Sequence, residues 1–252
     1  MTGRREWAAR RVLAAVDSLG RTFGAAIDAS SALRALGFHV GADVRFYGLE
    51  VATDTTCASG AVVGLGVRIG PAVTLRENSI VRSGASLRAD VVLGPAAVVG
   101  ENATLENIQI GANSQIEPGV VCLGHGKGRI VVGRESYIGL LNVIDWSGGV
   151  TIGDHVHVAG PTTAIWTHSS VLQALSGLPL ADKSLISTGA VSIEDRVYVG
   201  GNCTIYPGVQ IGAGSVVLPN SAVSASIPAG SLAGGVPAKV LGPAPVSRGS
   251  DD

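Results

Sequence analysis

Residues 57–105, which decide the fold, read CASGAVVGLGVRIGPAVTLRENSIVRSGASLRADVVLGPAAVVGENATL. An apolar side chain recurs there at every sixth position, and the same period returns from residue 193 to residue 223. These apolar positions are Cys57, Val63, Ile69, Leu75, Val81, Leu87, Leu93, Val99 and Leu105, then Ile193, Val199, Ile205, Ile211, Val217 and Val223. A period of six fits neither a helix nor an ordinary alternating strand. The sequence therefore predicts a repeat architecture.

A set of small residues occupies the position four residues after each apolar site. These residues are Ala61, Val67, Val73, Ser79, Ala85, Val91, Ala97 and Ala103. Glycine often follows the apolar site directly, as at Gly64, Gly70, Gly94 and Gly100, and we attribute it to the left-handed backbone angles of tight corners. We expect three hexads to form one triangular coil with large and small groups inside. Successive coils then pair like parallel strands, roughly 4.8 Å apart.

The beginning of the chain has a different pattern. Residues 1–39 place apolar side chains at helical spacing, from Trp7 to Phe23, which predicts a helical cap over the open first coil. The arginines of this segment leave a second interpretation open, an amphipathic helix lying on a membrane surface.

The rest of the chain divides by the rhythm of the repeat. We expect a first β-helix stack at 40–122, a connecting loop at 123–131, a second stack at 132–227 that contains a protruding loop at 167–190, and a tail at 228–252. The loop 123–131 reads LGHGKGRIV and lacks the Walker pattern of a phosphate-binding loop. The interruption 167–190 is the place where functional residues are expected, because excursions from a regular scaffold often carry them.

Composition excludes several classes of protein. The net charge of −1 gives no indication of nucleic acid binding, and no run of about 18 apolar residues predicts a membrane span. No long apolar stretch follows the first arginines, so we expect no signal peptide and a cytoplasmic protein. The cysteines Cys57, Cys122 and Cys203 fall on inward sites and are expected to be buried, reduced and inert.

Polar residues gather where the rhythm is disturbed most, between residues 141 and 170. Asn142 occupies a corner site, Asp145 follows an inward Ile, and His168 ends the last hexad before the interruption. The 23 residues from Asp145 to His168 make a little more than one coil, which predicts neighbouring coils and the same side of the prism. A histidine there can act as a general base, with a carboxylate nearby to fix its tautomer.

These residues resemble the active-site region of the bacterial hexapeptide-repeat transferases, in particular the maltose and galactoside O-acetyltransferase branch. The segment from Asn142 to Ile165-Trp-Thr-His168 and the closing Ala233-Gly-Gly-Val-Pro-Ala-Lys239 carry the likeness. The resemblance implies an all-β, left-handed parallel β-helix. It also implies that His168 is the base for direct transfer of an acetyl group from acetyl-CoA to a sugar hydroxyl, while Asp145 and Asn142 orient the histidine or the acceptor.

The same resemblance implies a homotrimer whose coenzyme groove lies between subunits. Gly200, Gly201 and Tyr198 would then line the acetyl-CoA site, and Lys239 would meet its phosphates. The chain departs from the family where Ser169 follows the histidine in place of a second histidine common in relatives, and in its own loop sequence at 167–190.

Three other functions stay open at this point. The acceptor can be the amino group of a nucleotide sugar, since that reaction also needs a base. The chain can be a non-catalytic β-helix assembly protein, although the presence of Asn142, Asp145 and His168 argues against this. A zinc enzyme similar to carbonic anhydrase is the third, with His155 and His157 as ligands together with His168 or His125. That family's His-x4-His pair is absent from the sequence, and we expect no metal.

Overall fold

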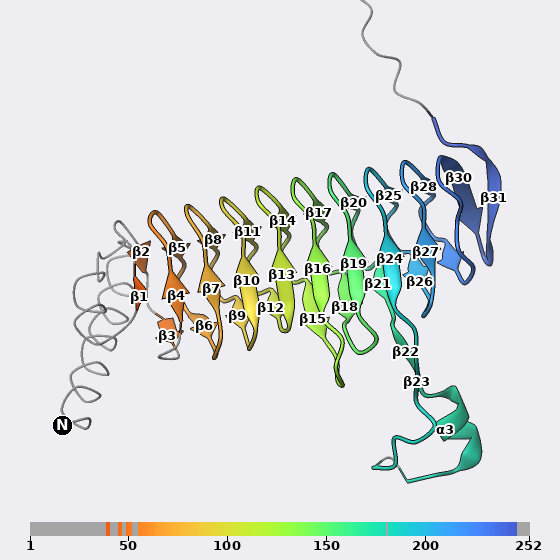
Figure 1. The fold of residues 1–252 in the computed structure, drawn as a ribbon, viewed down its shortest axis with the longest axis horizontal. Coiled ribbons are helices and arrows are strands. Elements are labelled where there is room, and N and C mark those ends of the chain that lie inside the picture. The colour runs from red at the N-terminus through yellow and green to blue at the C-terminus, as the bar shows by residue number, and fades with distance from the viewer. Residues whose placement is uncertain (1–38, 41–44, 47–48, 52–54, 180, 246–252) are drawn as a thin grey trace, which may run out of the picture.

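The fold is a prism of stacked coils whose three faces are parallel β-sheets (Figure 1). The computed structural model describes residues 39–40, 45–46, 49–51, 55–179 and 181–245. The three sheets are called B, A and C, in the order in which the chain passes through them. Each coil contributes one short strand to each sheet before the next coil begins. The prism is all-β and winds as a left-handed parallel β-helix, which confirms the predicted fold class.

The strands of each face follow one another at regular intervals. Sheet B consists of β1 (His39–Val40), β4 (Thr56–Cys57), β7 (Thr74–Leu75), β10 (Val91–Leu93), β13 (Ile108–Ile110), β16 (Ile130–Val132), β19 (Val150–Ile152), β24 (Val191–Ile193) and β27 (Gln210–Ile211). Sheet A consists of β2 (Arg45–Phe46), β5 (Val62–Val63), β8 (Ile80–Val81), β11 (Val98–Val99), β14 (Gln115–Ile116), β17 (Tyr137–Ile138), β20 (His157–Val158), β25 (Tyr198–Val199), β28 (Val216–Val217), β30 (Ser231–Gly235) and β31 (Ala238–Pro243). Sheet C consists of β3 (Leu49–Val51), β6 (Val67–Ile69), β9 (Ser86–Leu87), β12 (Thr104–Leu105), β15 (Val121–Leu123), β18 (Val143–Asp145), β21 (Ala164–Ile165), β26 (Thr204–Ile205) and β29 (Ala222–Val223).

The register of the sheets confirms three hexads per coil. Cys57 pairs with Leu75, and Leu75 pairs with Leu93, so equivalent residues lie eighteen positions apart. The pairing persists where the chain is longer: Ile110 pairs with Val132 across the loop 123–131, and Ile152 pairs with Ile193 across the interruption 167–190. Extra residues therefore leave the prism at its corners, and the ladder of sheet B runs through both loops without a break.

The interior is filled by the two sets of residues that the repeat predicts. The apolar sites and the small sites listed by period are buried, for example Leu87 and Leu93 with 0% exposure and Ala85 and Ala97 with 0% exposure. Alternating large and small groups fit the narrow triangular section of the prism, where close packing leaves no room for a second large layer. Burial of these side chains against the coils above and below supplies the main stabilisation.

The glycines that follow the inward sites have a different role from the one predicted. The left-handed backbone occurs two residues later, at Gly66 (φ 69°), Asn78 (φ 57°) and Asn102 (φ 57°). Gly70 is instead needed because a Cβ there would lie 1.5 Å from the carbonyl oxygen of Arg88 in the next coil. Glycine at this site therefore permits the close approach of stacked backbones, and the corner angle is provided by the other position.

A protruding arm leaves the prism between β21 and β24 (Figure 1). Its stalk pairs β22 (His168–Ser169) antiparallel with β23 (Ser187–Thr188), and its tip carries the helix α3 (Val171–Ser176). The helix buries Gln173, whose Nε2 donates to the carbonyl oxygen of Pro179 at 3.2 Å, whereas Leu172 and Leu175 are exposed. The arm thus presents apolar side chains outward and a polar one inward.

The structure describes most of the C-terminal tail but little of the segment expected to form the N-terminal cap. The tail, for which the sequence analysis predicts no strand, forms the antiparallel hairpin of β30 and β31, and β30 continues sheet A beside β28. The helical cap expected for residues 1–39 lies outside the described residues apart from His39, which begins β1. In the part of the chain that is described, no helix is long and apolar enough to cross a membrane.

The cysteines lie in the core, as expected. Cys57, Cys122 and Cys203 are buried and unpaired with one another. Burial raises the pKa of the Cys57 and Cys122 thiols to about 12, because the thiolate is poorly solvated inside the prism. These thiols are therefore protonated at neutral pH and behave as small apolar groups.

Replacing one inward leucine tests the assignment of the six-residue positions. Leu93→Ala should lower the free energy of unfolding by about 2–5 kcal/mol, because it leaves a cavity in a filled section of the core. The control Gln109→Ala, at an exposed outward position of the neighbouring strand β13, should change it by less than about 0.5 kcal/mol. Thermal unfolding followed by circular dichroism measures both, and equal losses would contradict the assignment.

Candidate active site

The centre of the candidate site is the carboxylate of Asp145, at the end of β18. Its side chain is 3% exposed, yet it accepts hydrogen bonds on both oxygens. Oδ1 accepts from the backbone N–H of Ser147 at 3.1 Å and from the Ser147 hydroxyl, while Oδ2 accepts from the backbone N–H of Thr167 at 2.9 Å and from its hydroxyl. These donors allow a charged carboxylate to remain charged although it is removed from water.

The balance of these effects fixes the charge of Asp145. Burial alone raises the pKa of its carboxyl, but the hydrogen bonds from Ser147, His168 and Thr167 outweigh burial and hold the pKa well below its usual range. Asp145 is therefore an anion at any pH at which the protein would work, and it acts only as an acceptor.

His168 lies at the root of the arm, on the coil next to Asp145. Strands β18 and β21 pair in register, Ile144 opposite Ile165, so the residues that follow each strand meet at the same corner of the prism. Nδ1 of His168 lies 2.7 Å from Oδ2 of Asp145. Because Asp145 is an acceptor only, Nδ1 carries the proton and Nε2 keeps a lone pair. The two side chains therefore lie on neighbouring coils and on the same side of the prism, as the spacing of 23 residues predicts.

Thr167 fastens the arm to the corner that holds the carboxylate. Its hydroxyl accepts from the backbone N–H of Gly148 at 2.8 Å, and its carbonyl oxygen accepts from the backbone N–H of Gly189 at 2.9 Å. The first and last residues of the arm are therefore bound to one another and to the coil below. This arrangement keeps His168 in place even though it begins a long excursion.

A second histidine, His125, for which the sequence indicated no role in acetyl transfer, belongs to the same cluster. His125 follows β15 in the corner loop 124–129, one coil before Asp145. Its Nδ1 lies 3.3 Å from the Ser147 hydroxyl, and its ring centroid lies 4.8 Å from that of His168 at an interplanar angle of 71°. The break of rhythm at LGHGKGRIV was the available signal, because it lies at the same corner one coil earlier.

Glycines bring this loop onto the carboxylate. A Cβ on Gly124 would lie 2.9 Å from Oδ1 of Asp145 and 2.9 Å from the backbone nitrogen of Ser147, and one on Gly128 would lie 2.0 Å from the carbonyl oxygen of Trp146. The glycine-rich composition of 123–131 therefore reflects close packing against the turn at 145–149.

Asn142 does not join this cluster. It lies at the opposite end of β18, in the corner between sheets A and C, and is buried with 1% exposure. Its Oδ1 accepts from the backbone N–H of Thr163 at 2.8 Å and its Nδ2 donates to the carbonyl oxygen of Ala159 at 3.2 Å. These bonds tie two coils together, and no hydrogen bond joins Asn142 to His168 in the described part of the chain.

The four residues expected to bind the coenzyme lie apart from His125 and His168. Tyr198 is on sheet A with its ring centroid 5.3 Å from that of His157, Gly200 and Gly201 form the next corner between sheets A and C, and Lys239 is exposed on β31. A Cβ on Gly201 would lie 2.6 Å from the carbonyl oxygen of Gly160, so this corner is tightly stacked on the coil before it. Gly200 and Gly201 thus lie at the corner where sheet C begins, and His168 lies at the corner where it ends.

His155 and His157, the alternative zinc ligands, do not lie together in a metal site. The ring of His157 lies between those of Tyr137 and Tyr198, at centroid distances of 4.4 Å and 5.3 Å, and His155 occupies a corner with φ 57°. Among the described residues, no three His, Cys, Asp or Glu side chains converge as a set of metal ligands.

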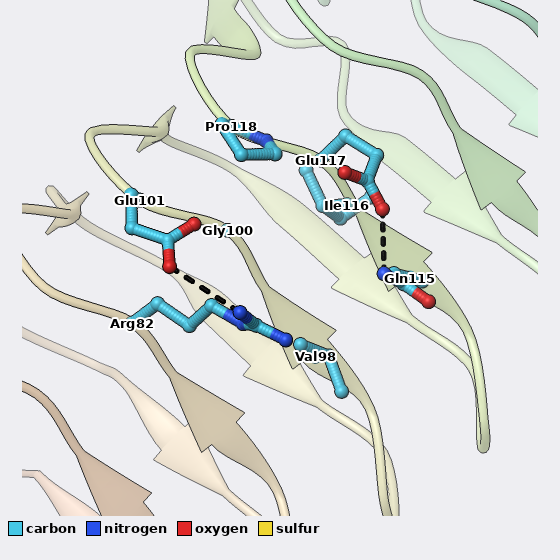
Figure 2. A pocket seen from close by; sticks show the side chains of 8 residues that line it. All are labelled: Arg82, Val98, Gly100, Glu101, Gln115, Ile116, Glu117 and Pro118. Atoms are coloured by element: carbon cyan, nitrogen blue, oxygen red, sulfur yellow. Dashed lines mark hydrogen bonds and ion pairs between the residues drawn. The ribbon is translucent and has the colours of Figure 1, made fainter.

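A pocket on sheet A lies away from all of these residues (Figure 2). It is lined by side chains near β8, β11 and β14, and Figure 2 shows Arg82 pointing toward Glu101 and Gln115 toward Glu117. Arg82 and Glu101 form an exposed ion pair at 3.3 Å, which contributes little to stability. No nucleophile or base other than carboxylates lines it, so it is not a second candidate for the active site.

Comparison with known families identifies the repeat. The family described as bacterial transferase hexapeptide (six repeats) matches residues 190–225. This segment contains Tyr198, Gly200 and Gly201, and it begins after Asp145 and His168. The solved structure of LpxA from Acinetobacter baumannii superimposes with a TM-score of 0.56 at 19% sequence identity, covering 77% of this chain and 70% of that one. At this identity the likeness concerns the fold alone.

Two relatives from Escherichia coli K12 have higher sequence identity to this chain over shorter segments. WbbJ, named for O-acetyl transfer in lipopolysaccharide biosynthesis, is 34% identical over 119 residues, which cover 39% of this chain and 60% of the relative. A galactoside O-acetyltransferase is 32% identical over 133 residues, which cover 52% of this chain and 62% of the relative. The chain thus spans about three-fifths of the length of each of these curated relatives.

A methyl group on Gly124 tests how the loop 124–129 supports the carboxylate. Gly124→Ala should displace Asp145 or the loop, lowering the free energy of unfolding by about 1–3 kcal/mol and shifting the ring-proton NMR signals of His168. Lys127→Ala, an exposed change in the same loop, is the control and should alter neither. Unchanged His168 signals in Gly124→Ala would show that the loop does not support the site.

Proposed function

We propose that this chain, a hexapeptide-repeat protein similar to sugar O-acetyltransferases, transfers an acetyl group from acetyl-CoA to a hydroxyl of a sugar or glycan precursor. The observation that carries the proposal is the 2.7 Å contact between Nδ1 of His168 and the buried anion of Asp145. This contact leaves the Nε2 lone pair of His168 available as a base, on an imidazole that reaches the surface with 25% of its side chain exposed.

The reaction follows from these roles. Nε2 of His168 accepts the proton of the acceptor hydroxyl while the hydroxyl oxygen attacks the thioester carbonyl carbon, so a C–O bond forms. Collapse of the tetrahedral intermediate breaks the C–S bond, and the proton passes from His168 to the leaving thiolate of CoA. Asp145 stabilises the imidazolium that exists between the two transfers and keeps the ring in the correct tautomer. No acyl-enzyme forms, because His168 acts as a base and not as a nucleophile.

A homotrimer accounts for the distance between the histidine and the expected coenzyme residues. His168 lies at the corner where sheet C ends, and Gly200 and Gly201 lie at the corner where sheet C begins. If three subunits place sheet C around a common axis, the ending corner of one subunit meets the beginning corner of its neighbour. Acetyl-CoA in that groove would contact His168 of one subunit and Gly200, Gly201 and Tyr198 of the other, with Lys239 toward its phosphates.

Exposed apolar side chains at both corners support this arrangement. Leu140 and Leu141 are 42% and 51% exposed at the beginning corner, and Trp166 and Tyr206 are 39% and 45% exposed at the ending corner. Apolar groups of this size on the surface of a rigid prism favour burial against another protein surface. The exposed Leu175 of the arm adds to this surface.

The choice between a hydroxyl and an amino acceptor is part of the proposal, since His168 can serve either reaction. The likeness to O-acetyltransferases favours the hydroxyl.

Titration of the purified protein with acetyl-CoA by calorimetry is the first test, with the mass of the assembly measured in parallel. Saturable binding near one site per subunit of a trimer supports the proposal, and no binding by a folded trimer overturns it in favour of an assembly role. An acceptor panel of glycosides and amino sugar nucleotides then decides between O- and N-transfer.

Removal of the imidazole tests the base. His168→Ala should reduce the transfer rate about 10²–10⁴-fold, because proton abstraction is lost while the coenzyme site and the prism remain. The rate of CoA release in the presence of an acceptor measures this, and acetyl-CoA affinity should stay within a few-fold of the parent. His39→Ala, at an exposed position of β1, is the control. Near-normal turnover by His168→Ala would refute the assignment.

Asp145→Asn tests the tautomer. The Asn amide can donate to Nδ1 of His168, which then carries its proton on Nε2 and cannot act as a base. We expect kcat to fall by about 10²–10⁴-fold with acetyl-CoA binding retained. Asp154→Asn, a change to a partly exposed carboxylate paired with Arg134, should leave kcat unchanged. Equal kcat in both variants would mean that Asp145 serves only the fold.

A further inference from the structure

The hydrogen bonds of Ser147 determine the protonation of His125. The Ser147 hydroxyl has one proton, and its closest acceptor is Oδ1 of the Asp145 anion. The hydroxyl oxygen must then accept from its other neighbours, the backbone N–H of His125 at 3.0 Å and Nδ1 of His125 at 3.3 Å. Nδ1 of His125 therefore carries a proton, and in the neutral ring Nε2 keeps a lone pair.

Two imidazoles are thus set in the same tautomer by one carboxylate. His168 is bound to Asp145 directly through Oδ2, and His125 is bound through Ser147 to Oδ1. Both Nδ1 atoms are directed back toward the buried anion, so both Nε2 atoms are on the sides of the rings turned away from it. The ring centroids are 4.8 Å apart, His125 is exposed, and His168 is partly exposed.

We propose that His125 binds the acceptor, with its Nε2 accepting a hydrogen bond from a second hydroxyl next to the one that is acylated. This inference rests on the proposed function and narrows its substrate class to acceptors with two neighbouring free hydroxyl groups, as on a sugar ring. The hydroxyl bound by His125 keeps its proton, and His168 alone removes one. His125 therefore sets specificity by positioning the diol.

Two substitutions of His125 separate its two nitrogen atoms. In His125→Asn the amide nitrogen can take the place of Nδ1 and retain the bond to Ser147, but nothing replaces Nε2. In His125→Gln the longer amide places an acceptor oxygen near the position of Nε2. The probe acceptors are methyl β-D-galactopyranoside and its monodeoxy analogues, measured with acetyl-CoA as donor.

For the parent galactoside, His125→Asn should raise KM about 10- to 100-fold with kcat within a few-fold of the original, because a hydrogen bond to the bound acceptor is lost. His125→Gln should recover part of this loss. One deoxy analogue should react poorly with the unaltered protein and equally poorly with His125→Asn, since it lacks the hydroxyl that His125 binds. The control is His155→Asn, at an exposed corner with φ 57° where Asn is well tolerated, and it should match the unaltered protein.

Two sets of results would refute either acceptor binding by His125 or the proposed function as a whole. Equal KM values for His125→Asn and the unaltered protein, or the same loss with every deoxy analogue, refute acceptor binding by His125. Transfer to no acceptor of any class by a protein that also fails to bind acetyl-CoA refutes the proposed function, and this inference with it.

The tautomer gives a readout that needs no acceptor. Long-range ¹H–¹⁵N NMR spectra of the full chain should show His125 and His168 both protonated on Nδ1 at a pH where the rings are neutral. Ser147→Ala should change this pattern for His125 and retain it for His168, because only His125 loses its acceptor. A proton on Nε2 of His125 in the unaltered protein would overturn the inference, since no lone pair would face the acceptor.

Discussion

The parallel pairing of each coil with the next is the constraint on which the rest of the structure depends. Backbone N–H groups of one coil donate to carbonyl oxygens of the following coil, as from Gly70 to Leu87 at 2.7 Å. This pairing fixes the distance between coils at about the spacing of neighbouring strands in a sheet. It also dictates which side chains point inward, which sites accept only glycine, and where extra residues can leave. Both long insertions emerge at the same corner, between sheets C and B, and neither shifts the register.

The candidate site is a product of the same stacking. His125, Asp145 and His168 belong to three successive coils and meet because the ladder superimposes one corner on the next. The middle coil supplies the charge, and its neighbours above and below each supply an imidazole. A buried carboxylate is costly unless donors surround it, and here the backbone of Ser147 and Thr167 provides them. The rigidity of the prism thus holds three groups from distant parts of the sequence at fixed separations.

The sequence predicts some levels of this structure well and others poorly, for physical reasons. The period of six predicts the three sheets, the inward residues and the proximity of Asp145 to His168, because each depends only on counting residues along a regular coil. His125 and the hairpin of β30 and β31 escape such counting, because irregular loops obey no period. The resemblance implies that Asn142 acts beside Asp145, yet β18 carries the chain across a whole face of the prism between them. The glycines that follow the inward sites are predicted to provide corner angles, whereas close contact with the next backbone is what requires them.

The hairpin that ends sheet A has a consequence for solubility. A stack of parallel coils exposes unpaired backbone groups at its end, and such an edge invites another chain to add itself and begin a fibre. In this protein β31 runs antiparallel to β30, so its direction is wrong for a further coil of the same kind. Pro243 lacks an N–H group to offer, and Lys239 adds a charge beside that edge. The hairpin therefore blocks the addition of another chain at this end of sheet A, which disfavours growth into a fibre.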